Sequence, residues 1–174
     1  MKKTFLRYGG LSALFMVLFF IVTELTLTRD DFDTNEILGW IGIFLSTTFV
    51  FFGIRYYRDR VNNGMLSFGK GLQVGLLILI IPSLAFGLFN VIYVVLNPEF
   101  MDNYYNYKVS QIRDSLPASE AAVKIEAMEK EKEMFMSPAV QFFAMFLSVF
   151  AVGLIVTVIS ALALRRGNAR VQSA

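Results

Sequence analysis

The chain has 174 residues, of which 56% are apolar and only 17% are charged, and its formal net charge is +2. A water-soluble core cannot cover so much apolar surface in so short a chain, because small domains leave a large share of their surface exposed. The composition therefore excludes an ordinary soluble domain, predicts that lipid surrounds most of the chain, and gives no reason to expect a nucleic-acid partner. The sequence has no Cys and no His, which removes thiolate nucleophiles and the commonest general base and zinc ligand. We therefore expect neither an enzyme nor a cofactor.

The first apolar run covers residues 9–27 and follows Lys2, Lys3 and Arg7. A basic start before an apolar stretch is also typical of a secretory signal peptide. This run is longer than the apolar region of such a peptide, however, and no small-residue cleavage site follows it. We predict an uncleaved first transmembrane helix.

Three more apolar runs are each close to the roughly 20 residues that cross the hydrocarbon core of a bilayer. They cover residues 37–54, 72–96 and 139–164. A lone strand would leave its backbone unpaired in lipid, so each run predicts a helix. Pro82 lies in the third run and predicts a kink there. Ser137 and Pro138 supply an N-cap and a first-turn proline for the fourth helix.

Residues 97–138 form a polar segment that is too long to lack structure in a compact protein. Its second half predicts an amphipathic helix at 118–136, because four of its apolar residues fall on one stripe that only Lys132 interrupts. The residues of this stripe are Ala121, Ile125, Met128 and Phe135. We expect the helix to lie on the membrane or across the bundle. The tyrosine-rich first half suits the membrane interface.

The sign of the charge alternates from one loop to the next. The amino terminus, residues 55–70 and the carboxy terminus each carry three more cations than acids, whereas residues 28–36 and 97–138 each carry three more acids than cations. Cytoplasmic loops carry an excess of Lys and Arg. The pattern therefore predicts that both termini and the basic loop are cytoplasmic and that the amphipathic helix is extracytoplasmic.

The basic loop is one candidate site. Its four cations lie near a single acid, Asp59, and juxtamembrane cations gain about 1 kcal/mol each near an anionic leaflet. They are Arg55, Arg58, Arg60 and Lys70. One interpretation is that they contact an anionic lipid headgroup or an acidic partner. The plainer one is that they only fix the orientation in the membrane and that Arg55 pairs with Asp59.

A second candidate is an intramembrane polar contact. Glu24 is the only acid inside an apolar run, and a carboxylate in the membrane is costly. Asn90 in the third run lies at a similar depth, so we expect a contact between Glu24 and Asn90, either as a structural clamp or as part of a polar pathway. The acidic loop has Asp30, Asp31 and Asp33, but it lacks the glycine and the distal Glu of a calcium loop.

Small residues lie at helical spacing on two of the runs. Gly71 and Gly75 share a face of the third helix, and Ala144 and Ser148 share a face of the fourth. Such spacing lets helix backbones approach closely. The faces serve either packing within the chain or contact with a second copy.

Two motifs are similar to those of a known family. An arginine-rich exit from the second helix and an Asn-Gly turn lead into MLSFGKG at residues 65–71, and NPEF follows the third run at 97–100. These resemble the signature of the bacterial membrane family called domain of unknown function 4199, and the resemblance covers nearly the whole chain. It implies four membrane helices, a charged helix before the fourth and a bacterial inner-membrane location. It implies no established activity and no catalytic residues.

We therefore predict an all-α polytopic membrane protein, with a four-helix transmembrane bundle and an extracytoplasmic amphipathic helix between the third and fourth spans. The basic loop and the amphipathic helix are two potential contact surfaces, and the sequence has no recognised catalytic motif. Both features favour a non-enzymatic interaction or accessory subunit. Its expected contacts are membrane lipids and a membrane-protein partner or a second copy. A small oligomeric transporter or channel is the alternative, with Glu24 and Asn90 lining its outer end.

Overall fold

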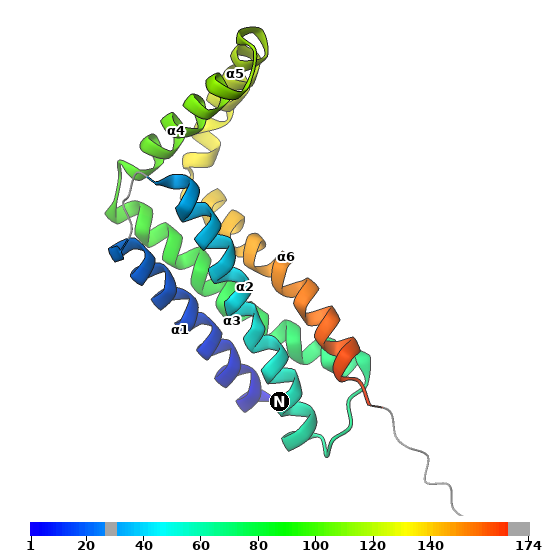
Figure 1. Ribbon diagram of the computed structural model, residues 1–174. Coiled ribbons are helices and arrows are strands. Elements are labelled where there is room, and N and C mark those ends of the chain that lie inside the picture. The colour runs from blue at the N-terminus through cyan, green and yellow to red at the C-terminus, as the bar shows by residue number, and fades with distance from the viewer. Residues whose placement is uncertain (27–30, 167–174) are drawn as a thin grey trace, which may run out of the picture.

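The computed structural model describes residues 1–26 and 31–166, and helices make up nearly all of this part (Figure 1). The helices are α1 (Lys2–Thr26), α2 (Phe32–Tyr56), α3 (Phe68–Leu96), α4 (Phe100–Ser115), α5 (Ala118–Met136) and α6 (Pro138–Leu164), and a π-helical turn, η1 (Tyr57–Val61), continues α2. Four of them, α1, α2 with η1, α3 and α6, are long and apolar enough to span a membrane. This confirms the predicted four-helix membrane bundle.

The spanning helices extend beyond the apolar runs that predict them. α1 begins at Lys2, and α2 begins at Phe32, within the segment that we expected to be an acidic loop. The reason is a helix cap, since the Asp31 carboxylate accepts a hydrogen bond of 3.1 Å from the Thr34 amide. An apolar run marks the thickness of the hydrocarbon, whereas a helix continues until its terminal amides are capped.

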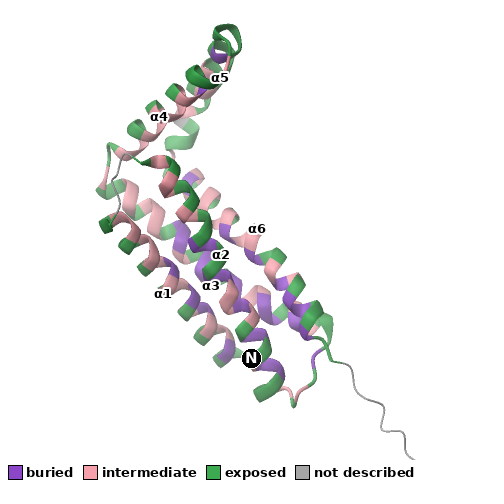
Figure 2. Cartoon of the chain, in the orientation of Figure 1, coloured by how far each residue is buried: buried purple, intermediate pink, exposed green. Residues whose placement is uncertain are grey.

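The four spans pack as a closed ring in the order α1, α2, α6, α3, with α2 and α3 also in contact across the middle. Buried residues line the inner faces of the ring, while the outer faces are exposed (Figure 2). The fully buried side chains include Met16, Ile54, Ile78, Leu79 and Val149. Apolar side chains from all four spans therefore make up most of the interior, together with buried hydroxyl side chains such as those of Ser12, Ser46 and Thr157.

Small residues set the spacing between α3 and α6. A Cβ added to Gly71 would lie 3.1 Å from the Cβ of Ala161, and one added to Gly75 would meet the side chain of Thr157. Both contacts are within the chain. The predicted small-residue face of α3 therefore serves intramolecular packing.

α3 continues through Pro82, which is buried. Proline has no amide hydrogen, so the Ile78 carbonyl four residues earlier loses its usual helical donor. Gly9 of α1 packs against this carbonyl: a Cβ there would lie 2.9 Å from the Ile78 oxygen and 2.6 Å from Cδ1 of Ile81. A glycine at this position lets the α1 backbone cover the freed carbonyl, where Cα–H groups form weak hydrogen bonds.

The polar segment is a helical hairpin. α5 has the predicted bounds, but the tyrosine-rich first half, for which no helix is predicted, is also a helix, α4. The hairpin projects away from one end of the bundle (Figure 1), so α5 does not lie across the bundle. That α5 lies on the membrane stays a prediction. α5 packs against α4, and Ala121 of the apolar stripe and Ile112 of α4 are buried.

Candidate functional site

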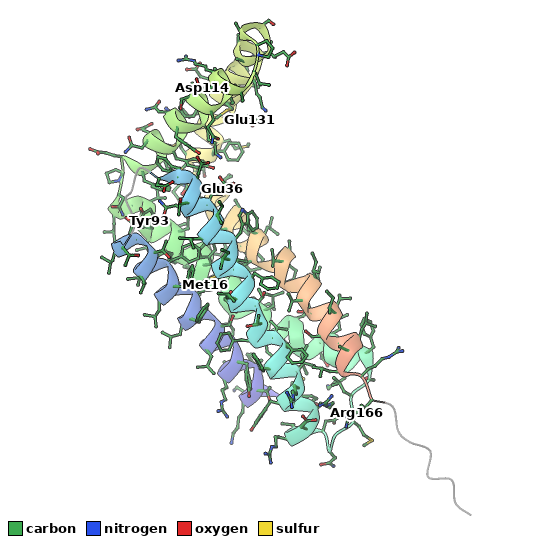
Figure 3. All side chains as sticks on the ribbon, in the orientation of Figure 1. Met16, Glu36, Tyr93, Asp114, Glu131 and Arg166 are labelled. Carbon is green, nitrogen blue, oxygen red and sulfur yellow. The ribbon has the colours of Figure 1, made fainter. Side chains whose placement is uncertain are left out.

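The loop between α2 and α3 is fastened to the end of α6. Leu66 and Arg166 exchange both backbone hydrogen bonds, at 3.1 and 2.8 Å. Arg166 therefore lies with the basic loop at one end of the molecule, while Asp114 and Glu131 lie in the hairpin at the other end (Figure 3). The two candidate surfaces of the sequence analysis are thus at opposite ends of the bundle.

Arg58 is used inside the protein. It is only 9% exposed. Its Nε and Nη2 atoms lie 2.6 and 3.0 Å from the two carboxylate oxygens of Asp59, and Nη1 lies 3.5 Å from the Leu164 carbonyl oxygen at the end of α6. A buried guanidinium with three of its N–H donors directed at Asp59 and Leu164 is poorly placed for the lipid or partner contact predicted for it.

The other three cations of the predicted site differ in what they contact. Arg55 is exposed, and its Nε lies 3.8 Å from the Asp59 carboxylate, which confirms the expected pairing four residues apart. Lys70 donates to Oε1 of Gln73 at 3.0 Å. Arg60 is exposed. These cations remain accessible from the basic end, in contrast to Arg58.

Arg7 in α1 belongs to the same end, although the sequence analysis used it only for orientation. Its guanidinium carbon lies 5.7 Å from the ring centroids of both Tyr8 and Tyr56. The two rings are in contact, with centroids 5.5 Å apart. In the sequence, an Arg-Tyr pair directly precedes the first apolar run and an Arg-Tyr-Tyr sequence directly follows the second, but only the fold shows that they meet.

The intramembrane polar contact has a different partner from the predicted one. Asn90 of α3 donates to Oε1 of Gln141 in α6 at 3.4 Å, and Gln141 donates to the Phe135 carbonyl at the end of α5 at 3.2 Å. Glu24 is half-buried on α1. Asn90 faces α6 because Gly87, one turn earlier on the same side of α3, packs against Phe142 of α6.

The hairpin packs on the first turns of α2, and we call the contacts between α4 and these turns the hairpin footing. The ring of Phe32 contacts the rings of Phe100, Tyr104 and Tyr107, with centroids 4.9 to 6.2 Å apart. Tyr107 donates its hydroxyl to Asp33, and this hydrogen bond is the main cause that raises the pKa of Tyr107 to about 12.

An ion pair strengthens this footing. Nζ of Lys108 lies 3.0 Å from Oε2 of Glu36. Asp33 also belongs to the footing, and Asp31 caps α2, so both acids have structural roles. Asp30 lies outside the described residues. Across residues 1–26 and 31–166, no three acidic side chains gather into a metal-binding group.

Lys132, the cation within the apolar stripe of α5, joins the two helices of the hairpin. Its Nζ lies 3.1 Å from Oδ1 of Asp102 and 4.5 Å from the ring centroid of Tyr105. A cavity of about 310 Å³ lies at the hairpin base. Its lining residues include Phe32, Tyr93, Leu96, Asn97, Pro98 and Phe100.

Comparison with known proteins identifies the family without supplying an activity. No curated protein and no solved structure matches the chain. A family model does match, over residues 7–166, which includes all four spans, the basic loop and the hairpin. The chain therefore belongs to the family described as "Protein of unknown function (DUF4199)".

Proposed function

We propose that this protein is a non-enzymatic accessory subunit of the bacterial inner membrane, and that the α4–α5 hairpin is the surface on which a partner protein docks. The bundle anchors the hairpin in the membrane. Both termini and the basic loop face the cytoplasm, and the hairpin faces the other side. The observation that carries the proposal is a helical hairpin that stands off the end of the bundle on specific contacts.

The hairpin is held at both of its ends. α4 is fixed to α2 by the Tyr107–Asp33 hydrogen bond and the Lys108–Glu36 ion pair. α5 is fixed to α6 by the hydrogen bond from Gln141 to its last turn. These contacts distinguish the hairpin from a loosely attached polar segment. A surface that is held in a fixed pose before binding loses less conformational entropy when it binds.

The outer face of α5 is open to a partner. Val123 is 70% exposed, and Met134 is also exposed. Charged side chains of both signs surround them, including the exposed ion pair between Glu126 and Lys130. Exposed apolar side chains within a polar rim are typical of protein interfaces.

The charge distribution supports the orientation. The end that carries Arg55, Arg60 and Arg166 is strongly cationic, and the hairpin end carries most of the acids. An excess of Lys and Arg marks the cytoplasmic side.

The packing of the bundle weighs against the alternative of a transporter or channel. Glycine and apolar contacts fill the space between the spans, as at Gly153, where an added Cβ would meet Leu79. A solute pathway would therefore need to form between several copies of the chain.

Site-specific photo-cross-linking in living cells tests the proposal. We expect a cross-linker at Val123, on the outer face of α5, to give a discrete adduct with one protein, and a neighbouring position, Ala127, to give the same adduct. A cross-linker at Ile155, on the exposed face of α6, is the matched control and should give lipid adducts only. Failure of both hairpin positions to give a protein adduct would count against an accessory role.

A further inference from the structure

The basic end contains a second, more specific arrangement than the loop cations, and it is built around Arg7. Gly53 makes this arrangement possible, because a Cβ there would lie 3.0 Å from the Cβ of Tyr8. The missing side chain lets Tyr8 close onto α2 and contact Tyr56, and the guanidinium of Arg7 lies over both rings.

Within residues 1–26 and 31–166, the N–H donors of Arg7 form no hydrogen bond. An aromatic ring supplies no oxygen or nitrogen acceptor, so its contact with a guanidinium leaves the five N–H groups available for such acceptors. Among the described residues, no acid forms an ion pair with Arg7. The same holds for Lys3, which lies four residues earlier and so on the same face of α1.

The depth of Arg7 and Tyr56 in the membrane indicates which group accepts hydrogen bonds from Arg7. Arg7 lies two residues before Gly9, where the apolar run of α1 begins, and Tyr56 lies two residues after Ile54, the last residue of the apolar run of α2. Both are therefore at the boundary between hydrocarbon and headgroups, where tyrosine rings are enriched. The phosphates of lipids lie at this same level.

We propose that Arg7, Lys3, Tyr8 and Tyr56 form a binding site for the headgroup phosphate of an anionic phospholipid. The planar fork of Arg7 matches two phosphate oxygens, the two rings hold the fork in place, and Lys3 adds a second charge. The site lies at the opposite end of the molecule from the hairpin and is independent of the docking role proposed for it.

Native mass spectrometry of the full-length protein tests the site. The protein is released from nanodiscs that contain phosphatidylglycerol and phosphatidylcholine in equal amounts. We expect the unaltered chain to retain phosphatidylglycerol preferentially. Arg7→Gln should lower this retention about fivefold, and Tyr56→Leu should lower it although the net charge is unchanged. Arg165→Gln removes an exposed cation from the same end and should leave retention unchanged.

Three outcomes would overturn the site. Equal losses in Arg7→Gln and Arg165→Gln would reduce the binding to a diffuse attraction of lipid by the basic end. Unchanged retention in Arg7→Gln would remove Arg7 from any site. Displacement of the lipid by inorganic phosphate would assign the site to a soluble anion.

Two further measurements separate binding from folding and from the role of the hairpin. The melting temperature in neutral detergent shows whether each variant is folded, and Arg7→Lys keeps the charge while removing the planar fork, so it should bind less lipid than the unaltered chain. The cross-link from Val123 should be unaffected in all these variants, so the lipid site and the docking role can fail separately.

Discussion

Arg58 and Asp59 are consecutive in the chain, yet their side chains form a bidentate ion pair with N–O distances of 2.6 and 3.0 Å. The pair lies in the π-helical turn η1, and the same guanidinium reaches the Leu164 carbonyl at the end of α6. Irregular turns of this kind within helices often mark positions with a special role. Here the turn lets one buried cation join the second span to the fourth.

Loss of Arg58 should therefore weaken the bundle. We expect Arg58→Ala to lower the free energy of unfolding by about 2 kcal/mol, because hydrogen bonds of a buried charge are lost. Arg60→Ala, two residues away and exposed, is the control and should change it by less than about 0.5 kcal/mol. Unfolding by a denaturing detergent measures both, and equal effects would contradict the internal role of Arg58.

Gly9 and Gly10 are neighbours in α1 and should respond in opposite ways to the same substitution. A Cβ at Gly9 would lie 2.9 Å from the Ile78 oxygen, whereas one at Gly10 meets nothing within 4 Å. We expect Gly9→Ala to destabilise the bundle by about 1–3 kcal/mol through overpacking. Gly10→Ala should be neutral or stabilise it by up to about 1 kcal/mol. The same unfolding titration distinguishes them; similar effects would contradict the close approach of α1 to α3.

The contribution of Tyr107 to the stability of the hairpin footing should be lost at alkaline pH. Its pKa is raised from 10.0 to about 12 by the hydrogen bond to Asp33, so its contribution to stability is fully present below the unfolded pKa. That contribution is lost as the pH rises through the folded value. The tyrosinate absorbance of the unaltered chain minus that of Tyr107→Phe should show a transition near the folded value. A transition at the ordinary tyrosine pKa would show that the bond to Asp33 is absent.

Asn90 and Gln141 should be coupled energetically. Hydrogen bonds between membrane helices contribute about 0.6 kcal/mol on average in double-mutant cycles. We expect a cycle of Asn90→Leu and Gln141→Leu to give a coupling energy of about this size. A parallel cycle of Asn90→Leu with Glu24→Gln tests the pairing that the sequence suggested. A larger coupling in the second cycle would restore the original interpretation.

The proposed orientation can be tested without background labelling, because the chain has no Cys. We expect a cysteine introduced at Ser119 in the hairpin to react with an impermeant maleimide in intact spheroplasts. A cysteine at Asn63, in the basic loop, should react only after the membrane is permeabilised. The reverse pattern would invert the topology.

The number and type of the spans could be predicted from the sequence because an apolar run of membrane length has few alternatives in a chain this hydrophobic. The bounds of α5 were also predictable, since Pro117 and Ser137 flank it and the residues of its apolar stripe have helical spacing. α4 was missed because its tyrosines and asparagines have low helix propensity. Packing on Phe32 and α5 overrides that preference.

The partners of individual side chains were less predictable than the helices. Depth in the membrane suggested Glu24 for Asn90, but depth does not say which way a helix face points, and Gln141 proved to be the neighbour. Counting charges put Arg58 with the exposed cations, although its neighbour Asp59 and the end of α6 bury it. Both outcomes depend on the rotation of helices about their axes, which only the assembled bundle determines.

The two backbone bonds between Leu66 and Arg166 have a practical consequence for work with this protein. Force applied to the chain beyond Arg166 reaches α6 through the backbone and, through these two bonds, also the loop that carries the family motif. A bulky fusion at the carboxy terminus therefore loads this junction directly, whereas one at the amino terminus does not.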